Sequence, residues 1–261
     1  MLTRREVFVC AAALAGSSTL LDGRAPNPPD VSPAFPSHDP ALAREMVGVS
    51  HGNAARVREL LDQHPALAKA AWDWGYGDWE TALGAASHMG SREIAELLLA
   101  HGAGPTIFSA AMLGELDNVK ASVAARPSVT RTRGPHGITL MAHAKAGGPA
   151  AQPVVAFLTE RGDADIPYTN EALSEADLKA IVGTYAFGSA DSDALTVTSG
   201  SGGLSIARVG GVERRLFHLG GRVFHPAGAE AVRITLSGSP ERATQLRVDD
   251  GPVRVDASRR D

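Results

Sequence analysis

The side chains best suited to chemistry in this sequence are carboxylates and histidines of its first 150 residues. Three acids lie in one short segment, and three histidines follow them along the chain: Asp73, Asp78, Glu80, His88, His136 and His143. Such groups act as acids and bases, hold ions or orient small ligands. Their spacing matches no known metal motif, and the sequence therefore predicts neither a metal site nor catalytic residues. An enzyme or small-ligand binder that uses these six residues together is the alternative hypothesis.

Aromatic residues gather in the same segment. All three tryptophans fall within residues 72–80, beside a tyrosine flanked by glycines. Large aromatic side chains contribute much of the binding energy at protein interfaces. We therefore expect this segment to bind a protein partner, together with the three histidines, through Trp72, Asp73, Trp74, Tyr76, Asp78, Trp79, Glu80, His88, His136 and His143. The competing interpretation is that some of these rings fold back over neighbouring alanine-rich helices.

Several other kinds of site are excluded or disfavoured. The glycine-rich stretch at residues 200–203 lies between expected strands, so it does not form a phosphate-binding loop before a helix. No serine lies in the strand-to-helix turn that a hydrolase nucleophile needs. The single cysteine, Cys10, lies near the start of the chain, within the expected export signal. We expect no cofactor. The net charge of −4 disfavours nucleic acid as a partner.

The first 25 residues are typical of an export signal. Arg4 and Arg5 precede a moderately apolar run, and small residues follow at 23–25. The paired arginines resemble a twin-arginine signal. Residues 26–40 contain six prolines and are expected to form an extended linker. The sequence thus predicts a periplasmic or secreted protein, with no membrane insertion once residues 1–25 are removed.

A repeated pattern organises residues 41–167. Its clearest copy, Thr81 to Gly104, predicts a short alanine-rich helix, a turn at Gly90 and a second helix whose buried stripe holds Ile94, Leu97 and Leu98. Related segments surround the glycines at 52, 114 and 148. The mean spacing of these four glycines is about 32 residues, close to the ~33 of one repeat class. His51 directly precedes the turn glycine at 52, and His88 is separated from the turn glycine at 90 by one residue.

These segments resemble the ankyrin repeat. Thr81, the alanine pair, the glycine turn, the leucine run and the final Gly-Ala-Gly follow its usual order, although Ala82 and Gly84 replace its proline and histidine. The resemblance implies an all-α solenoid of four repeats, with projecting loops beside a concave face where partners bind.

From residue 173 onward the pattern changes. A short helix is expected at 173–181, and from Gly183 short alternating segments are separated by Gly, Pro or Asp turns, which predicts a small antiparallel barrel or sandwich over 173–261. Gly183 and Tyr185 resemble the start of the lipocalin-like barrel appended to some bacterial serine hydrolases. Its interior is expected to hold Ile206, Leu216, Phe217, Val223 and Phe224, with the alternate arginines facing outward and a filled core.

The sequence as a whole therefore predicts a two-part α + β protein, an ankyrin solenoid followed by a barrel. Its expected function is that of a monomeric, non-catalytic scaffold in the cell envelope, binding a protein through the concave face and residues 72–80. The alternative retains a ligand site, either in the Asp/Glu/His set or in a cavity of the C-terminal barrel.

Overall fold

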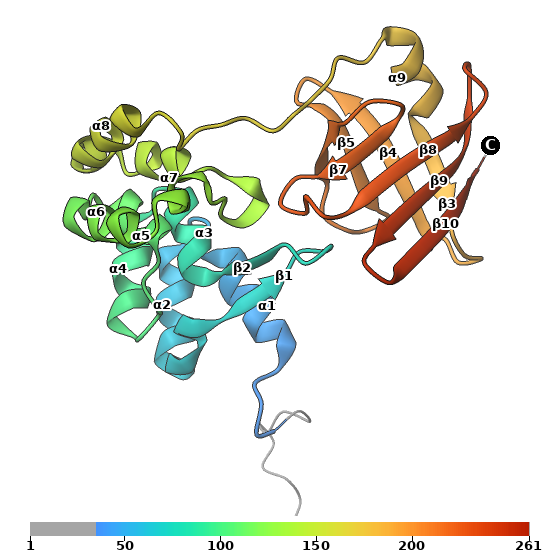
Figure 1. Ribbon diagram of the computed structural model, residues 1–261. Coiled ribbons are helices and arrows are strands. Elements are labelled where there is room, and N and C mark those ends of the chain that lie inside the picture. Colours follow the sequence, from blue (N-terminus) through green and yellow to red (C-terminus); the bar gives the residue numbers. More distant parts are fainter. Residues whose placement is uncertain (1–34, 261) are drawn as a thin grey trace, which may run out of the picture. The chain divides into compact units, whose positions relative to one another are not determined.

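The computed structural model describes residues 35–260, and the predicted signal at 1–25 lies outside them together with most of the predicted linker at 26–40. The fold is mixed α and β, with helices in the N-terminal part and a closed barrel of eight antiparallel strands in the C-terminal part (Figure 1). The prediction of these two parts is confirmed, and the β part is a barrel. No helix among the described residues is long and apolar enough to cross a bilayer.

The helical part consists of four successive helix pairs. In the last three pairs a helix of seven residues precedes a longer one, whereas the two helices of the first pair have ten residues each. The pairs are α1 (Pro40–Val49) and α2 (Ala54–Gln63), α3 (Ala82–His88) and α4 (Arg92–Ala100), α5 (Ile107–Leu113) and α6 (Leu116–Ala125), α7 (Leu140–Ala146) and α8 (Gln152–Arg161). Threonine caps three of the first helices by accepting a backbone N–H bond, at Thr81, Thr106 and Thr139.

Short elements connect the pairs. The 3-10 turn η1 (Pro65–Lys69) leads into a two-stranded hairpin, β1 (Ala71–Asp73) and β2 (Trp79–Thr81), which pairs Trp72 with Glu80. The 3-10 turns η2 (Pro127–Arg131) and η3 (Pro135–Gly137) connect the third pair to the fourth, and η4 (Gly148–Ala151) lies between the two helices of the fourth pair. In β2 the side chains alternate, so that Glu80 is buried between the exposed Trp79 and Thr81.

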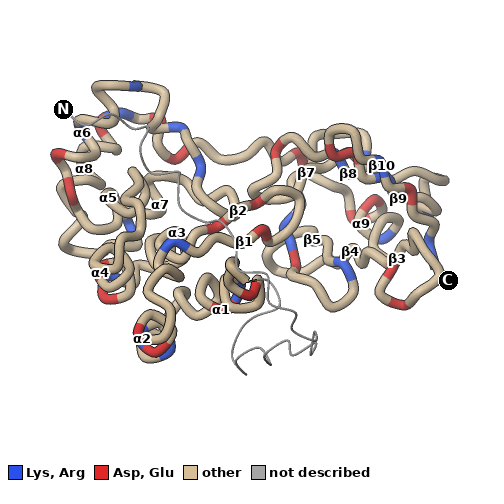
Figure 2. Tube along the Cα trace, turned by 90° about the horizontal axis from the view of Figure 1, so that it is seen from below, with Lys and Arg blue, Asp and Glu red and all other residues tan. Residues whose placement is uncertain are grey.

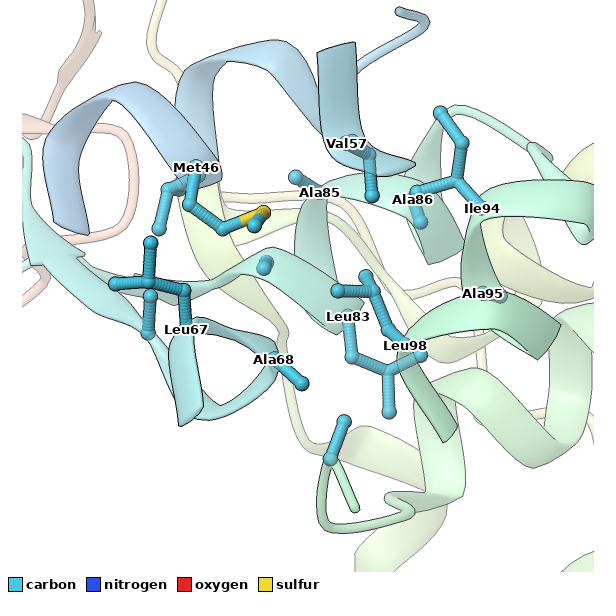
Figure 3. Close-up of a cluster of buried hydrophobic side chains, with 14 of the residues drawn as sticks. Met46, Val57, Leu67, Ala68, Leu83, Ala85, Ala86, Ile94, Ala95 and Leu98 are labelled. Carbon is cyan, nitrogen blue, oxygen red and sulfur yellow. The ribbon is translucent and has the colours of Figure 1, made fainter. Parts of the chain in front are cut away.

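Two apolar clusters hold the helical part together. Figure 3 shows the first, in which α1 to α4 bring together Met46, Val57, Leu83, Ile94 and Leu98. The second joins the helices from α5 to α8. Acidic and basic residues are interspersed along α2, as the colours of Figure 2 show.

The turns of the second and third helix pairs both lie close to the backbone of the fourth pair. Gly90 and Gly114 both have positive φ, at 70° and 77°. A Cβ atom on Gly90 would lie 2.2 Å from the carbonyl oxygen of Ala146, and one on Gly114 would lie 2.3 Å from that of Ala150. Only glycine fits these two turns, because both the conformation and the space exclude a side chain.

The C-terminal part begins with α9 (Glu175–Ile181), capped by Ser174. The barrel closes in the order β10-β3-β4-β5-β6-β7-β8-β9. Its strands are β3 (Gly183–Ala186), β4 (Ala194–Gly200), β5 (Gly203–Arg208), β6 (Arg214–His218), β7 (Val223–Pro226), β8 (Arg233–Gly238), β9 (Ala243–Asp250) and β10 (Val253–Arg259). Ala180 and Ile181 of α9 pack into the barrel core with Tyr185 and Phe224.

Strand alternation corrects part of the predicted interior. Ile206, Leu216 and Phe224 lie in the barrel core as expected. Phe217 and Val223 do not, because neighbouring residues of a strand face opposite sides of the sheet and Leu216 and Phe224 take the inner positions. Phe217 instead stacks with His225, at a centroid distance of 5.3 Å.

Candidate functional site

Four elements of the helical part converge on the buried carboxylate of Glu80. Glu80 comes from β2 and His88 from the last turn of α3, whereas His136 lies in the turn η3 and His51 follows α1. One nitrogen of each histidine and one oxygen of Glu80 all lie within 4.8 Å of one another. Residues that are distant in the sequence, from 51 to 136, thus form one group, which we call the His/Glu cluster.

The imidazoles present the same atom to Glu80. Nε2 of His88 lies 2.9 Å from a Glu80 carboxylate oxygen, and Nε2 of His136 lies 3.3 Å from that same oxygen. Nε2 of His51 lies 3.5 Å from the other oxygen. That second oxygen also accepts a hydrogen bond of 2.7 Å from the indole N–H of Trp74. Glu80 is entirely buried and therefore depends on these partners.

In His51 and His136 the other ring nitrogen, Nδ1, lies beside a hydrogen-bond acceptor. Nδ1 of His51 lies 3.1 Å from the carbonyl oxygens of both Val47 and Gly48, so it must carry a proton that it donates to them. Nδ1 of His136 lies 2.8 Å from Asp78. A neutral imidazole with a protonated Nδ1 has its lone pair on Nε2, which in both residues faces the centre of the cluster.

Asp78 fixes the position of His136. One Asp78 oxygen accepts the backbone N–H of His136 at 2.9 Å, while the other contacts the ring. Arg214 of the barrel donates to the second oxygen as well. His136 has a φ of 60°, a strained value for a residue with a side chain, and the two bonds from Asp78 stabilise it.

The charges of the cluster are coupled. Burial raises the pKa of Glu80, but hydrogen bonds from His136 and His88 outweigh that effect and hold the pKa at about 2. Burial lowers the pKa of His136, yet its hydrogen bonds to Asp78 and Glu80 raise it to about 9. The pKa of Asp78 is lowered by His136 and Arg214 in spite of its burial. At neutral pH, without a bound ion, a protonated His136 thus lies between two carboxylates.

No family model matches this chain, and no curated protein is found as a relative.

His143 lies beside the cluster without belonging to it. Its ring centroid is 6.4 Å from that of His88, and its Nδ1 is 2.9 Å from the Thr139 carbonyl oxygen. The side chain is buried, which lowers its pKa to about 4. Its Nε2 has no hydrogen-bond partner among the described residues. His143 is therefore neutral at physiological pH.

The aromatic residues predicted to bind a partner take different positions. Trp72 and Trp74 are half-buried against the first apolar cluster, and Tyr76 packs against the barrel core. Asp73 accepts the backbone N–H of Gly75 within the hairpin and takes no part in the cluster. Trp79 is the aromatic of this segment that remains largely exposed, at 63%.

The structure thus joins Glu80, His88 and His136 of the predicted set, with Asp78 behind them. His51 is absent from that predicted set, although its position at a turn glycine, corresponding to that of His88, was a usable signal. Arg214 is also absent from the set, since nothing in its local sequence separates it from the neighbouring Arg215. Three imidazole nitrogens and a carboxylate oxygen can together hold a metal ion or, without one, share protons.

Proposed function

We propose that this protein binds a divalent transition-metal ion through His51, Glu80, His88 and His136. The convergence of four donor atoms within 4.8 Å carries this proposal. Ligand atoms about 2.1 Å from one tetrahedral ion lie about 3.4 Å apart. One Glu80 oxygen lies 2.9 Å from His88 and 3.3 Å from His136, close to that value, and the other Glu80 oxygen lies 3.5 Å from His51.

The surroundings of the donors support a metal site as well. Metal-bound histidines usually donate their second N–H to a carbonyl or carboxylate oxygen, as His51 and His136 do here. Imidazole-rich sets favour Zn²⁺, Ni²⁺, Cu²⁺ or Fe²⁺, whereas Mg²⁺ and Ca²⁺ require mostly oxygen ligands. The side chains of His51 and His136 are 31% and 27% exposed, so an ion has access from their side.

A titration of the chelator-treated protein tests this function. We expect Zn²⁺ and Ni²⁺ to bind in a 1:1 ratio by calorimetry, while Mg²⁺ and Ca²⁺ give no signal. The variants His51→Gln and His136→Gln should weaken Zn²⁺ binding at least tenfold. His101→Gln is the matched control, because His101 is exposed and bonds only its own helix. Absence of Zn²⁺ binding, or equal weakening by the control, would contradict the proposal and leave the cluster as a hydrogen-bonded core.

We also propose that the four helix pairs are ankyrin repeats. The threonine caps at Thr81, Thr106 and Thr139 occupy equivalent places, and the turns at Gly90 and Gly114 make the same close contact with a later pair. The hairpin β1–β2 corresponds to the projecting loop of such a repeat. In this arrangement the His/Glu cluster combines residues of the first two repeats and the loop between them with His136 from the loop before the fourth repeat.

Binding of a protein partner in the cell envelope is the second proposed function. The exposed Trp79 supports it, because a large exposed ring beside a hairpin is a typical interface anchor. Crosslinking in cells that express the full chain, compared between wild type and Trp79→Ala, tests this role, with fractionation to locate the protein. Loss of a specific crosslink in the variant is the expected result. An unchanged pattern, or retention in the cytoplasm, would count against it.

A further inference from the structure

One end of the barrel holds an apolar pocket of about 410 Å³. Leu195 is the second residue of β4 and Ile206 lies in the second half of β5, whereas Val248 is late in β9 and Val255 early in β10. Because neighbouring strands are antiparallel, these four positions lie at the same end of the barrel. Tyr76, from the tip of the hairpin β1–β2, lines the pocket as well. The volume lies within the range typical of small-molecule sites, about 300–1,000 Å³.

The buried arginine Arg214 of β6 lies beside these apolar side chains. Arg214, Leu216 and His218 are the buried positions of that strand, and Arg214 pairs with Ile206 of β5. Arg214 is only 5% exposed and lines the pocket. Its neighbour Arg215 points to the other face and is exposed.

The guanidinium of Arg214 is only partly satisfied. Nη1 contacts Asp78, but Nε and Nη2 have no hydrogen-bond partner among the described residues. Of the pocket-lining residues, only Arg208 is also charged, and it pairs with Asp193 outside the pocket. Buried donors without partners are costly, and a guanidinium is best satisfied by a planar oxyanion that accepts two of its N–H groups.

We propose that this pocket binds an aliphatic carboxylate. The carboxylate accepts hydrogen bonds from Nε and Nη2 of Arg214, and the tail lies among Leu195, Ile206 and Val248. Tyr185 and Phe224 fill the barrel core and are fully buried, which limits the ligand to a short chain. This site goes beyond the proposed metal function and requires no metal ion.

The test uses the full chain in the presence of a chelator, so that its outcome is independent of metal binding. Octanoate, octanol and octylammonium share one tail and differ in the head group. We expect octanoate to bind at least tenfold more tightly than either of the others, by calorimetry and by a change in tryptophan fluorescence, since Trp74 lines the pocket. Equal binding of octanoate and octanol, or no binding of octanoate, would overturn the proposal.

Two variants and one control locate the site. Arg214→Gln should reduce octanoate affinity at least tenfold, whereas Arg215→Gln, altered on the opposite face of the same strand, should leave it unchanged. Val255→Trp fills the pocket from a half-buried position and retains Arg214. It should abolish octanoate binding without changing the Zn²⁺ titration, and it decides the question if Arg214→Gln fails to fold. Undiminished octanoate binding by Val255→Trp would refute this location.

Discussion

At the scale of single residues, the behaviour of His136 depends on the acids at its two ring nitrogens. Asp78 lies 2.8 Å from Nδ1 and a Glu80 oxygen lies 3.3 Å from Nε2. The first contact orients the ring and increases its basicity, while the second accepts the Nε2–H of the protonated ring in the metal-free protein. The two carboxylates therefore have separate roles, which substitution can distinguish.

Asp78→Asn should weaken Zn²⁺ binding about 10–100-fold, the usual effect of removing an acceptor behind a ligating histidine. The substitution keeps the shape of the side chain but removes the charge that holds His136. Asp73→Asn is the matched control, because Asp73 lies in the same hairpin and bonds only the backbone of Gly75. Isothermal titration of all three proteins measures the effect. An Asp78→Asn protein with wild-type affinity would show that Asp78 does not support a ligand.

His136 also predicts a pH dependence for the metal-free protein. Its pKa is about 9 in the folded state, above the ordinary value of 6.5. The stabilisation is therefore complete below pH 6.5 and is lost as the pH rises through 9. We expect the free energy of unfolding to fall by on the order of 2 kcal/mol across this window.

Urea unfolding at several pH values measures this loss. His136→Gln should remove the alkaline decline, whereas His101→Gln, on the exposed surface, should retain it. A decline of equal size in the His136→Gln protein would assign the effect to another group.

At the scale of elements, the glycine turns that contact the fourth helix pair predict a large loss of stability on substitution. Gly90→Ala combines an unfavourable φ of 70° with a Cβ atom 2.2 Å from the Ala146 carbonyl oxygen. We expect a loss of stability of about 2–4 kcal/mol. Gly52→Ala is the control, since a Cβ atom at that position would meet no other atom within 4 Å. Tryptophan fluorescence during urea unfolding reports on the helical part, where all three tryptophans lie.

The elements themselves were largely predictable from the sequence. The turn glycine at 90, the leucines after it and the threonine cap before it indicate a helix pair, and period-two alternation from residue 183 indicates strands. The inner face of β6 was not predictable, because Leu216 and Phe217 are both apolar and only the register places Leu216 inside.

The His/Glu cluster was harder to predict than the elements. The alternative hypothesis grouped Glu80, His88 and His136 with three further residues, but which of the six meet depends on how the helix pairs and a hairpin pack. Metal motifs are recognised from short local spacings, and here the donors span residues 51–136. The sequence also contained no reason to distinguish Arg214 from the several other arginines of the strands.

At the scale of the whole molecule, Asp78 accepts hydrogen bonds from two cations that belong to different parts of the fold. His136 is in the helical part, and Arg214 is in the first position of β6. If a carboxylate ligand neutralises Arg214, Asp78 interacts more strongly with His136 and increases its basicity as a ligand. We therefore expect octanoate to tighten Zn²⁺ binding about fivefold, near the lower end of typical coupling between sites.

Two titrations measure this effect, one of Zn²⁺ with and without octanoate and one of octanoate with and without Zn²⁺. Asp78→Asn should make the two affinities independent, whereas Asp73→Asn should leave their dependence intact. Independent affinities in the wild-type protein would show that Asp78 does not connect the sites.

The shared carboxylate has a further consequence, which is reciprocity. Thermodynamic linkage requires each ligand to change the affinity of the other by the same factor. The affinity of each site would then depend on whether the other site is occupied, although the two ligands are chemically unrelated. Asp78 would then make the barrel an allosteric regulator of the helical part, and the helical part an equal regulator of the barrel.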